Sequence, residues 1–543
     1  MLLLLIFVVS AFAQSPTKLE TLAAMKKAAA FYKEKVATHG GYHFAYTDDL
    51  SYGRSESSET PNRVELQRDG TPRVGMAYLE AFHATGDTFY LEAARSVAHT
   101  LVRGQLCSGG WDYWIEFDPQ QRRRFPYRAD GNCESPKIRG ASSTTFDDNV
   151  SQANLRFLMR TDRELRFQDA AIHEAAQFAL ESFIKAQYPN GAWPQRYSEF
   201  PDPANYPVKK ASYPASWSRQ WPGENYRQHY TFNDNSIADC IDMMLEAGRI
   251  YNEPKYLASA EKGGQFILLA QMPEPQPAWA QQYDLDMHPA WARVFEPPSV
   301  TGGESQGILR MLMVLYRETG NRKYLEPVPR ALDYLKRSIL PPVENPSEVR
   351  RRVGPGPVLA RFYELQTNRP LYITKGTTVS VKGFPSLRTD GYELSYSDES
   401  VITHYGVLVS ARALPEIEQE YRKVATEDPA RLRRPDRLRG LSPWSESQQR
   451  PPVTPQQARA ILDSMDARGA WVEEGVIGKA DRLFQVFAAK PMLLMVNRKP
   501  IQISENDTVE LFLGSQPPRT RILRSTTFAA NLEALAAYVA ALP

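Results

Sequence analysis

The chain has few cysteines, almost no net charge and no long apolar segment beyond its first residues. Only 3 of its 543 residues are cysteine, which excludes a disulfide-rich scaffold and a multi-cysteine zinc site. The 65 basic residues are balanced by 63 acidic ones, and a net charge of +2 argues against a nucleic-acid partner bound through global charge. No later run of 18 apolar residues occurs, so we expect a soluble mature protein without a membrane partner.

The cysteines leave two alternatives open. Cys107 and Cys133 could be bridged with Cys240 free, or all three could be buried thiols. Residues 1–14 are apolar and end in the small-residue pattern Ala11-Phe12-Ala13. Because this run is too short to span a bilayer, it is typical of a secretory signal, and we expect a secreted or periplasmic protein.

Internal repetition organises most of the chain. The aromatic motifs Gly109-Gly110-Trp111, Gly191-Ala192-Trp193 and Gly469-Ala470-Trp471 recur, and paired helical patterns begin near Thr71, Thr145, Thr231 and Glu296. One helix pair cannot bury its apolar face alone, so repeated pairs must stack on one another. The sequence therefore predicts an all-α fold, an (α/α) toroid or incomplete barrel of repeated helix pairs, with the irregular loops gathered at one end.

The predicted domains follow from breaks in this pattern. After the signal, residues 15–424 form the toroid, and the charged, proline-studded residues 425–456 form a linker or surface excursion. Residues 339–360 are rich in proline and indicate an irregular connection. Residues 457–543 contain a predicted strand pair (VFAAKPMLLMV and VELFLG) and a helical run from Phe528 to Ala541. The pattern leaves open whether this part is a separate domain or closes the ring.

Acidic residues concentrate where two of the repeat helices open. The segments 145–149 (TFDDN) and 231–235 (TFNDN) are near copies. Helix N-caps alone could explain them, because Asp and Asn are preferred there. A cap needs only one such side chain, however, and each segment carries three. If both openings meet at one end of the ring, Asp147, Asp148 and Asp234 can form a hard-oxygen site suited to Ca²⁺.

A second group of candidates is basic or aromatic. Arg293, Arg361 and Arg369 stand beside aromatics in proline-bounded loops, as expected of arginines that bind carboxylates through two hydrogen bonds. The alternative is a structural ion pair with Glu296 or Glu364. In addition, Trp193 and Arg196 offer an aromatic face and hydrogen-bonding groups for a sugar, unless the indole is buried against its own loop.

Five separated segments together resemble the family-10 pectate lyases. They are TTFDDNVSQANLRFLM (144–159), YPNGAWPQRY (188–197), TFND (231–234), PAWARVFEPPSVTGGES (289–305) and RFYELQTNRP (361–370). The resemblance covers roughly residues 140–410 and keeps the motifs in order. It implies an (α/α) barrel-like toroid that cleaves polygalacturonate, or a related acidic polysaccharide, by Ca²⁺-assisted β-elimination. We expect such an enzyme to be a monomer.

The resemblance also implies roles for the acidic residues. Asp147 and Asp234 correspond to the residues that serve the Ca²⁺ and the substrate carboxylate. Asp148 falls where the family usually has Asn, and we expect it to contact the substrate. The alternatives are a glycoside hydrolase with Asp147 and Asp234 as acid and base, and a glycan-binding protein without catalysis.

For the basic residues, the resemblance implies that Arg293 is the catalytic base and that Arg361 binds substrate. Because an ordinary arginine pKa lies above about 12, nearby cations and partial desolvation are expected to favour the neutral form of Arg293. Lys375 stands near the position of a further arginine of the family. Lysine keeps the positive charge there but lacks the planar guanidinium that binds a carboxylate through two hydrogen bonds. Finally, the insertion at residues 207–228 is longer than the family pattern and is expected to reshape the cleft.

Overall fold

The computed structural model describes most of the chain. The described residues are 15–131, 133, 143–223, 226, 229–374, 378–379, 387–389, 393–399, 401–403, 405–433, 452–477, 482–487, 491–496, 499–504, 508–513 and 519–543. The predicted signal (1–14), Lys375 and much of the predicted linker therefore lie outside the described residues. Among the described helices, none combines the length and hydropathy that a membrane span requires.

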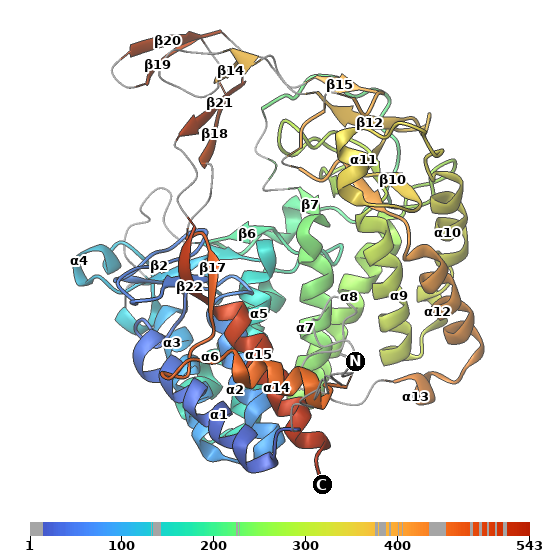
Figure 1. Ribbon diagram of the computed structural model, residues 1–543. Helices are drawn as coiled ribbons and strands as arrows, with labels where there is room; N and C mark the ends of the chain where they lie inside the picture. Colours follow the sequence, from blue (N-terminus) through green and yellow to red (C-terminus); the bar gives the residue numbers. More distant parts are fainter. Residues whose placement is uncertain are drawn as a thin grey trace, which may run out of the picture.

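The core of the molecule is a succession of antiparallel helix pairs (Figure 1). One helix of each pair belongs to an inner layer whose members contact one another in the order α15, α2, α5, α7, α9. These inner helices are α15 (Ser525–Ala541), α2 (Thr71–Thr85), α5 (Val150–Glu164), α7 (Ser236–Tyr251) and α9 (Glu304–Thr319). Their outer partners are α1 (Lys18–Phe31), α3 (Thr88–Gly104), α6 (Ala170–Ala186), α8 (Pro254–Ala270) and α10 (Val328–Arg337). The predicted (α/α) toroid of repeated pairs is confirmed.

Glycine and a capping side chain encode the turn within a pair. Helix α2 ends at Gly86, whose φ of 70° is a left-handed conformation that glycine adopts without strain. The next residue, Asp87, accepts a hydrogen bond from the backbone N–H of Phe89 and so caps α3. Gly320, with a φ of 71°, and Asn321 repeat this arrangement after α9. The same short sequence signal therefore reverses the chain in separate repeats.

Short strands connect the repeats at one end of the helices (Figure 1). The strand before an inner helix pairs with the strand that follows its outer partner. The pairs are β3 (Arg63–Glu65) with β4 (Trp114–Glu116), β5 (Thr144–Thr145) with β6 (Arg196–Tyr197), β7 (Tyr230–Thr231) with β8 (Gln282–Tyr283), and β9 (Val300–Thr301) with β11 (Phe362–Tyr363). Because every pair forms at the same end, the loops and the polar residues of all repeats meet there.

Recurring tryptophans hold three of the outer helices, α3, α6 and α8, and also helix α14 (Pro455–Asp463), to this end. Trp111, Trp193, Trp279 and Trp471 are all buried. Each indole N–H donates to a carbonyl near the end of the preceding helix, those of Leu101, Phe183, Ile267 and Ile461, at 2.9 Å in all four cases. A buried indole requires such a partner, so the repeated Gly-x-Trp motif is a structural feature of the repeat.

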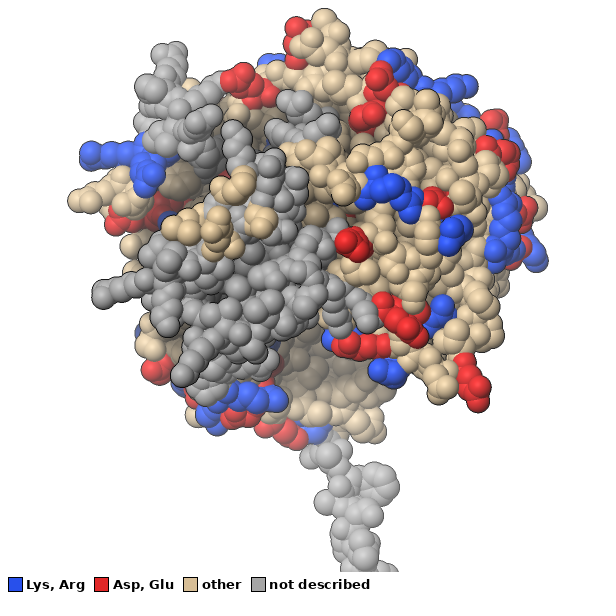
Figure 2. Space-filling model, turned by 90° about the horizontal axis from the view of Figure 1, so that it is seen from above, with Lys and Arg blue, Asp and Glu red and all other residues tan. Residues whose placement is uncertain are grey.

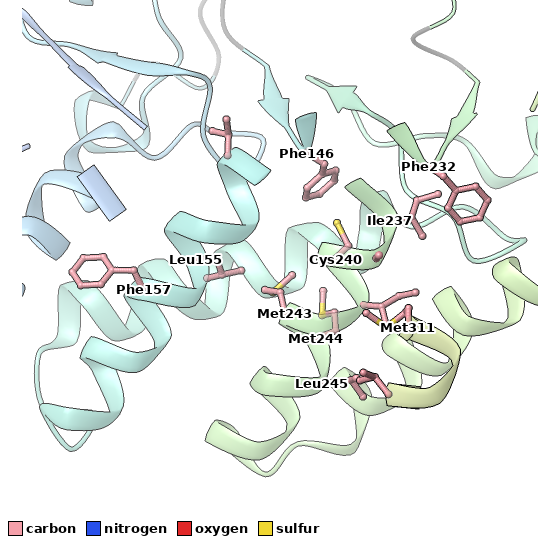
Figure 3. Close-up of a cluster of buried hydrophobic side chains, with 14 of the residues drawn as sticks. Phe146, Leu155, Phe157, Phe232, Ile237, Cys240, Met243, Met244, Leu245 and Met311 are labelled. Carbon is pink, nitrogen blue, oxygen red and sulfur yellow. The ribbon is translucent and has the colours of Figure 1, made fainter. Parts of the chain in front are cut away.

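Aromatic and sulfur-containing side chains fill the space between the inner helices (Figure 3). Phe146 and Phe232 lie beneath the turns that open α5 and α7, while Leu155, Met243 and Met311 lie deeper, between the helices (Figure 3). All five are buried. The turns that carry the candidate acids are thus anchored from below by packed aromatic rings.

The two ends of the chain meet in the ring. Strand β22 (Thr520–Arg524) pairs with β1 (Ala45–Thr47) and with β17 (Val472–Gly475). Helix α15 then packs against both α1 and α2, and the buried Glu533 pairs with Arg73 at 3.0 Å. The last segment of the chain therefore supplies an inner helix that packs directly on the helix pairs of the first residues.

The remaining elements decorate the ring. The strands of the C-terminal part differ from the predicted pair: VELFLG lies largely in β21 (Thr508–Leu513), which pairs with β18 (Arg482–Phe487), whereas MLLMV forms β19 (Met492–Val496), which pairs with β20 (Lys499–Ile503). The segment 339–360, predicted to be irregular, contains α11 (Glu348–Val353) and β10 (Val358–Ala360). The other elements are α4 (Pro119–Arg122), α12 (Leu414–Thr426), α13 (Pro429–Leu432), α14 (Pro455–Asp463), β2 (Gly53–Arg54), β12 (Pro370–Ile373), β13 (Thr378–Val379), β14 (Leu387–Thr389), β15 (Leu394–Ser395) and β16 (Leu408–Ser410).

Cys107 and Cys133 form a disulfide, and Cys240 is a buried free thiol.

Candidate active site

Two nearly identical turns present the acidic residues. The turns η3 (Asp147–Asn149) and η6 (Asn233–Asn235) lie between a short strand and helices α5 and α7. In each turn two consecutive residues are left-handed, with φ of 50° and 56° at Asp148 and Asn149 and of 50° and 58° at Asp234 and Asn235. Asn and Asp tolerate this conformation better than other residues with a side chain. Neither N-cap asparagine caps its helix through its side chain, so the N-cap explanation of these motifs is wrong.

The packing of α5 against α7 brings the two turns into contact. As a result, oxygen atoms of Asp147, Asp148 and Asp234 all lie within 4.8 Å of one another. Desolvation, followed by the charges of Asp147 and Asp148, raises the pKa of Asp234 to about 7. Desolvation and the charge of Asp147 likewise raise the pKa of Asp148. Three crowded carboxylates repel one another, and a cation or a proton relieves that repulsion.

These carboxylates line a cavity of ≈ 300 Å³ that also contains Arg293. Its other lining residues are Glu56, Gln195, Tyr226, Thr231, Asn233, Gln281, Gln282, Ala292, Glu296 and Tyr405. Figure 2 views this end of the molecule and shows acidic and basic side chains interspersed over the described surface. The acids from the two turns and the arginine that follows Ala292 therefore meet in one place.

Arg293 is held by a buried carboxylate. Its Nε and Nη2 donate to the two oxygens of Glu296 at 2.8 and 2.7 Å, and its backbone N–H donates to the same group at 3.0 Å. Glu296 also accepts from Tyr405 Oη at 2.5 Å and from Gln281 Nε2 at 2.7 Å. Burial acts to lower the pKa of Arg293, but the hydrogen bonds and charge of Glu296 outweigh it and hold that pKa above its ordinary value. The expectation that the surroundings favour the neutral arginine is therefore wrong for the metal-free protein.

Arg361 approaches the cavity from β11's side and shares an aromatic ring with Arg293. Its Nη2 donates to Glu304 Oε1 at 2.6 Å and to Asn233 Oδ1 at 3.1 Å. The ring centroid of Tyr405 lies 4.2 Å from its guanidinium carbon and 5.3 Å from that of Arg293. Tyr405 therefore contacts both cations and lies with them beside the cavity.

Arg196 lies next to the acidic turns. Its Nη2 donates to Asp147 Oδ2 at 3.1 Å and to the Tyr113 hydroxyl at 2.9 Å. That hydroxyl is 3.0 Å from Asp147 Oδ2 and 3.1 Å from Asp148 Oδ2. Arg196 therefore neutralises part of the carboxylate charge on one side of the cluster.

Among the described residues that were predicted to form the site, Arg196, Arg361, Trp193 and Arg369 are not part of the cavity lining. Trp193 is 1% exposed and belongs to the repeated indole lock, so it offers no face to a sugar. Its loop packs closely on helix α8, since Gly191 has a φ of 99° and an added Cβ would lie 1.9 Å from the Lys262 carbonyl oxygen. Arg369 is exposed and stacks on Tyr396, with 3.4 Å between its guanidinium carbon and the ring centroid. Lys375 lies outside the described residues.

Several cavity residues were not predicted from the sequence. Tyr405, Gln281 and Glu56 belong to segments far apart in the chain and carry no local signal of a site. Tyr113 does not line the cavity but contacts Asp147, and it could have been found because it follows the Gly-Gly-Trp motif by two residues. Tyr226, which belongs to the insertion that was expected to reshape the cleft, lines the cavity.

The sequence of the chain matches the profile of one protein family, described as pectic acid lyase, over residues 116–401. No curated protein gives a match. Among solved structures, the chain is similar to a family 10 polysaccharide lyase from Cellvibrio cellulosa, at 17% identity and a TM-score of 0.41, over 64% of this chain and 95% of that one. A mutant of that lyase in complex with trigalacturonic acid is 17% identical with a TM-score of 0.42, over 65% of this chain and 98% of that one. A D-mannose isomerase is 16% identical with a TM-score of 0.37, over 64% of this chain and 74% of that one.

Proposed function

The chain belongs to the pectic acid lyase family, and from that premise we propose that it is a secreted enzyme that cleaves polygalacturonate by Ca²⁺-assisted β-elimination in the cavity between η3, η6 and Arg293. The observation that carries the proposal is the meeting of three carboxylates and an oriented arginine in one ≈ 300 Å³ space. A uronate polymer brings to such a space both a carboxylate to be neutralised and an acidic C–H beside it.

The acidic cluster fits a calcium ion. All of its donors are carboxylate oxygens, the ligands that Ca²⁺ prefers, and they come from Asp147, Asp148 and Asp234. Desolvation and the charges of Asp147 and Asp148 raise the pKa of Asp234, and a cation bound among these carboxylates would offset their repulsion. Bound there, Ca²⁺ would neutralise the C6 carboxylate of a galacturonate and make its C5 proton more acidic.

Arg293 is the proposed base. In the elimination, the base takes the C5 proton, the C5–H electron pair forms the C4–C5 double bond, and the C4–O bond breaks as the leaving oxygen gains a proton. Glu296 engages Nε and Nη2 of Arg293 and leaves Nη1 outside this pair. Positive charge among the carboxylates would oppose the effect of Glu296 on the Arg293 pKa, and alkaline pH would populate the neutral form further.

The other arginines are proposed to bind the polymer. Arg361 stands beside Asn233 of the acidic turn, and Arg196 stands beside Asp147. Each guanidinium can therefore reach a sugar that contacts the cluster from its own side. Both bind carboxylates of this protein in the absence of substrate, so substrate binding would exchange or share these pairs. Asp148, on the same turn, is proposed to contact substrate hydroxyls.

Export is supported by the Cys107–Cys133 disulfide. Such bonds form and persist in oxidising compartments and are rare in the cytosol. A fractionation of producing cells tests this: the protein should be recovered outside the cytoplasm with the disulfide intact. Recovery of reduced protein in the cytosol would contradict it.

The direct test of the proposed function is a product assay on polygalacturonate. We expect ultraviolet absorbance from a 4,5-unsaturated product with Ca²⁺ at alkaline pH, and loss of it with EDTA. Arg293→Lys should lose activity in both conditions while retaining its fold by circular dichroism. A glycoside hydrolase using Asp147 and Asp234 would instead give saturated ends, resist EDTA and tolerate Arg293→Lys. A glycan-binding protein would bind oligogalacturonate without any product.

A further inference from the structure

Residues 218–221 of the insertion contact the loop that carries Arg293. Trp221 Nε1 donates to the Ala292 carbonyl at 2.8 Å, and Trp291 Nε1 donates back to the Ser218 carbonyl at 2.9 Å. Ala292 and Arg293 line the cavity. Residues 218–221 therefore lie directly against the loop that carries the proposed base.

The same stretch reaches a second group of side chains. Arg219 forms an ion pair with Glu364, and its Nη2 donates to the Tyr396 hydroxyl at 2.6 Å. Its guanidinium carbon lies 4.8 Å from the ring of Trp217 and 5.5 Å from that of Tyr396. Tyr396 in turn donates to Glu364 at 2.6 Å. The insertion thus fixes the position of an exposed tyrosine ring outside the cavity.

Arg369 covers that ring and keeps its charge available. Its guanidinium carbon is 3.4 Å from the Tyr396 centroid, and within the described part of the chain it forms no ion pair with an acidic side chain. Glu364 neutralises only Arg219, so the group of Trp217, Arg219, Glu364, Arg369 and Tyr396 carries one net positive charge. A stacked guanidinium with free donors is suited to binding a carboxylate.

We propose that Arg369 and the Tyr396 ring form a subsite for an additional uronate unit of the polymer, outside the catalytic cavity and held in place by the insertion. This inference rests on the proposed function. The chemistry of the group matches the ligand: the guanidinium of Arg369 pairs with the C6 carboxylate, and the exposed part of the Tyr396 side chain contacts the sugar. The subsite is connected to Arg293 through the contacts of residues 292, 221 and 219, and its residues do not line the cavity. We therefore expect longer oligomers to reach it and the shortest not to.

The test compares initial rates on trigalacturonate and hexagalacturonate with saturating Ca²⁺. For Arg369→Gln we expect KM for the hexamer to rise about fivefold, the loss of one exposed charge-assisted contact. We expect kcat to stay within about twofold and the kinetics on the trimer to stay unchanged. Arg369→Lys, which keeps the charge without the planar stack, should lie between wild type and Arg369→Gln. Arg422→Gln, an exposed arginine paired with Glu418 on α12, is the matched control.

The outcomes separate this subsite from the function on which it rests. If wild-type protein releases no unsaturated product from either oligomer, the proposed function falls and the subsite with it. If wild type is active but Arg369→Gln changes both oligomers equally, or neither, only the subsite is overturned. A fall in kcat on both oligomers would show instead that Arg369 supports the Arg293 loop as a structural residue.

Discussion

At the scale of single residues, the site is defined by charges that oppose one another. Asp234 has a pKa of about 7 against an ordinary value of 3.8, so the folded protein binds this proton more tightly than the unfolded chain does. The contribution of Asp234 to stability is therefore complete below about pH 4 and is lost as the pH rises through 7. The metal-free protein should become less stable toward alkaline pH, which is where the proposed base, Arg293, would become neutral.

Asp234→Asn should relieve this repulsion. In EDTA at pH 8 we expect its Tm to exceed that of wild type by about 2 °C, because Asp234 is exposed and solvent screens the effect to about 1 kcal/mol. At pH 4 the two should agree. Added Ca²⁺ should raise the wild-type Tm and leave the variant unchanged. Asp286→Asn, at an exposed aspartate paired with Lys209, is the control for generic charge removal, and equal behaviour of the two variants would contradict the assignment.

The Arg293–Glu296 pair gives a second prediction at this scale. Because Glu296 raises the pKa of Arg293, Glu296→Gln should lower that pKa. If Arg293 is the base, the rising limb of kcat against pH should move to lower pH, while the maximal rate falls roughly tenfold or more because the guanidinium loses its bidentate hold. A pH–rate profile measures both effects. Glu364→Gln, at the carboxylate paired with Arg219, should leave the limb in place. A limb that stays in place in Glu296→Gln would mean that Arg293 acts only as a cation.

At the scale of the element, the acidic turns depend on consecutive left-handed residues. Asn235 has a φ of 58° and does not cap α7 with its side chain, so its contribution is the backbone conformation it tolerates. We expect Asn235→Ala to cost about 1–2 kcal/mol and to weaken Ca²⁺ binding, and Asn235→Gly to be close to neutral. Thermal unfolding and calcium titration of both variants check this. Equal losses for alanine and glycine would point to the amide and not to the backbone.

The helix pairs and acidic turns could be predicted from the sequence because they repeat. The near copies at 145–149 and 231–235 indicate equivalent places in the fold, and the order of the repeats brings them together. Trp193 could not be assigned in this way, since a buried and an exposed indole give the same motif. Its burial follows from the backbone carbonyl of Phe183, which accepts the indole N–H. The hold of Glu296 on Arg293 was only one of two alternatives, because ion pairing depends on tertiary geometry.

At the scale of the whole molecule, the ring depends on its last helix. Helix α15 is an inner helix that packs against both α1 and α2. No repeat motif in the sequence predicted this position. Glu533 on α15 and Arg73 on α2 form a buried pair, with side-chain exposures of 1% and 11%. Residues far apart in the sequence are therefore direct neighbours in the folded protein.

Removing one partner of this pair should weaken the whole fold. Glu533→Ala leaves Arg73 without its buried partner, and we expect a loss of about 3 kcal/mol in the free energy of unfolding, measured by denaturant titration. Arg422→Ala, which breaks an exposed pair on α12, should cost less than about 0.5 kcal/mol. Similar small losses of unfolding free energy for both variants would show that the contact between α15 and α2 contributes little to the stability of the fold.

The convergence of the acidic turns and Arg293 on one bound sugar is tested most directly by a crystal structure of the Arg293→Lys variant with Ca²⁺ and trigalacturonate. We predict an ion coordinated by Asp147 and Asp234, a uronate carboxylate on that ion, Asp148 in contact with the substrate, and the C5 hydrogen of that sugar facing residue 293. An ion bound away from these carboxylates, or a sugar whose C5 faces away from residue 293, would contradict the account.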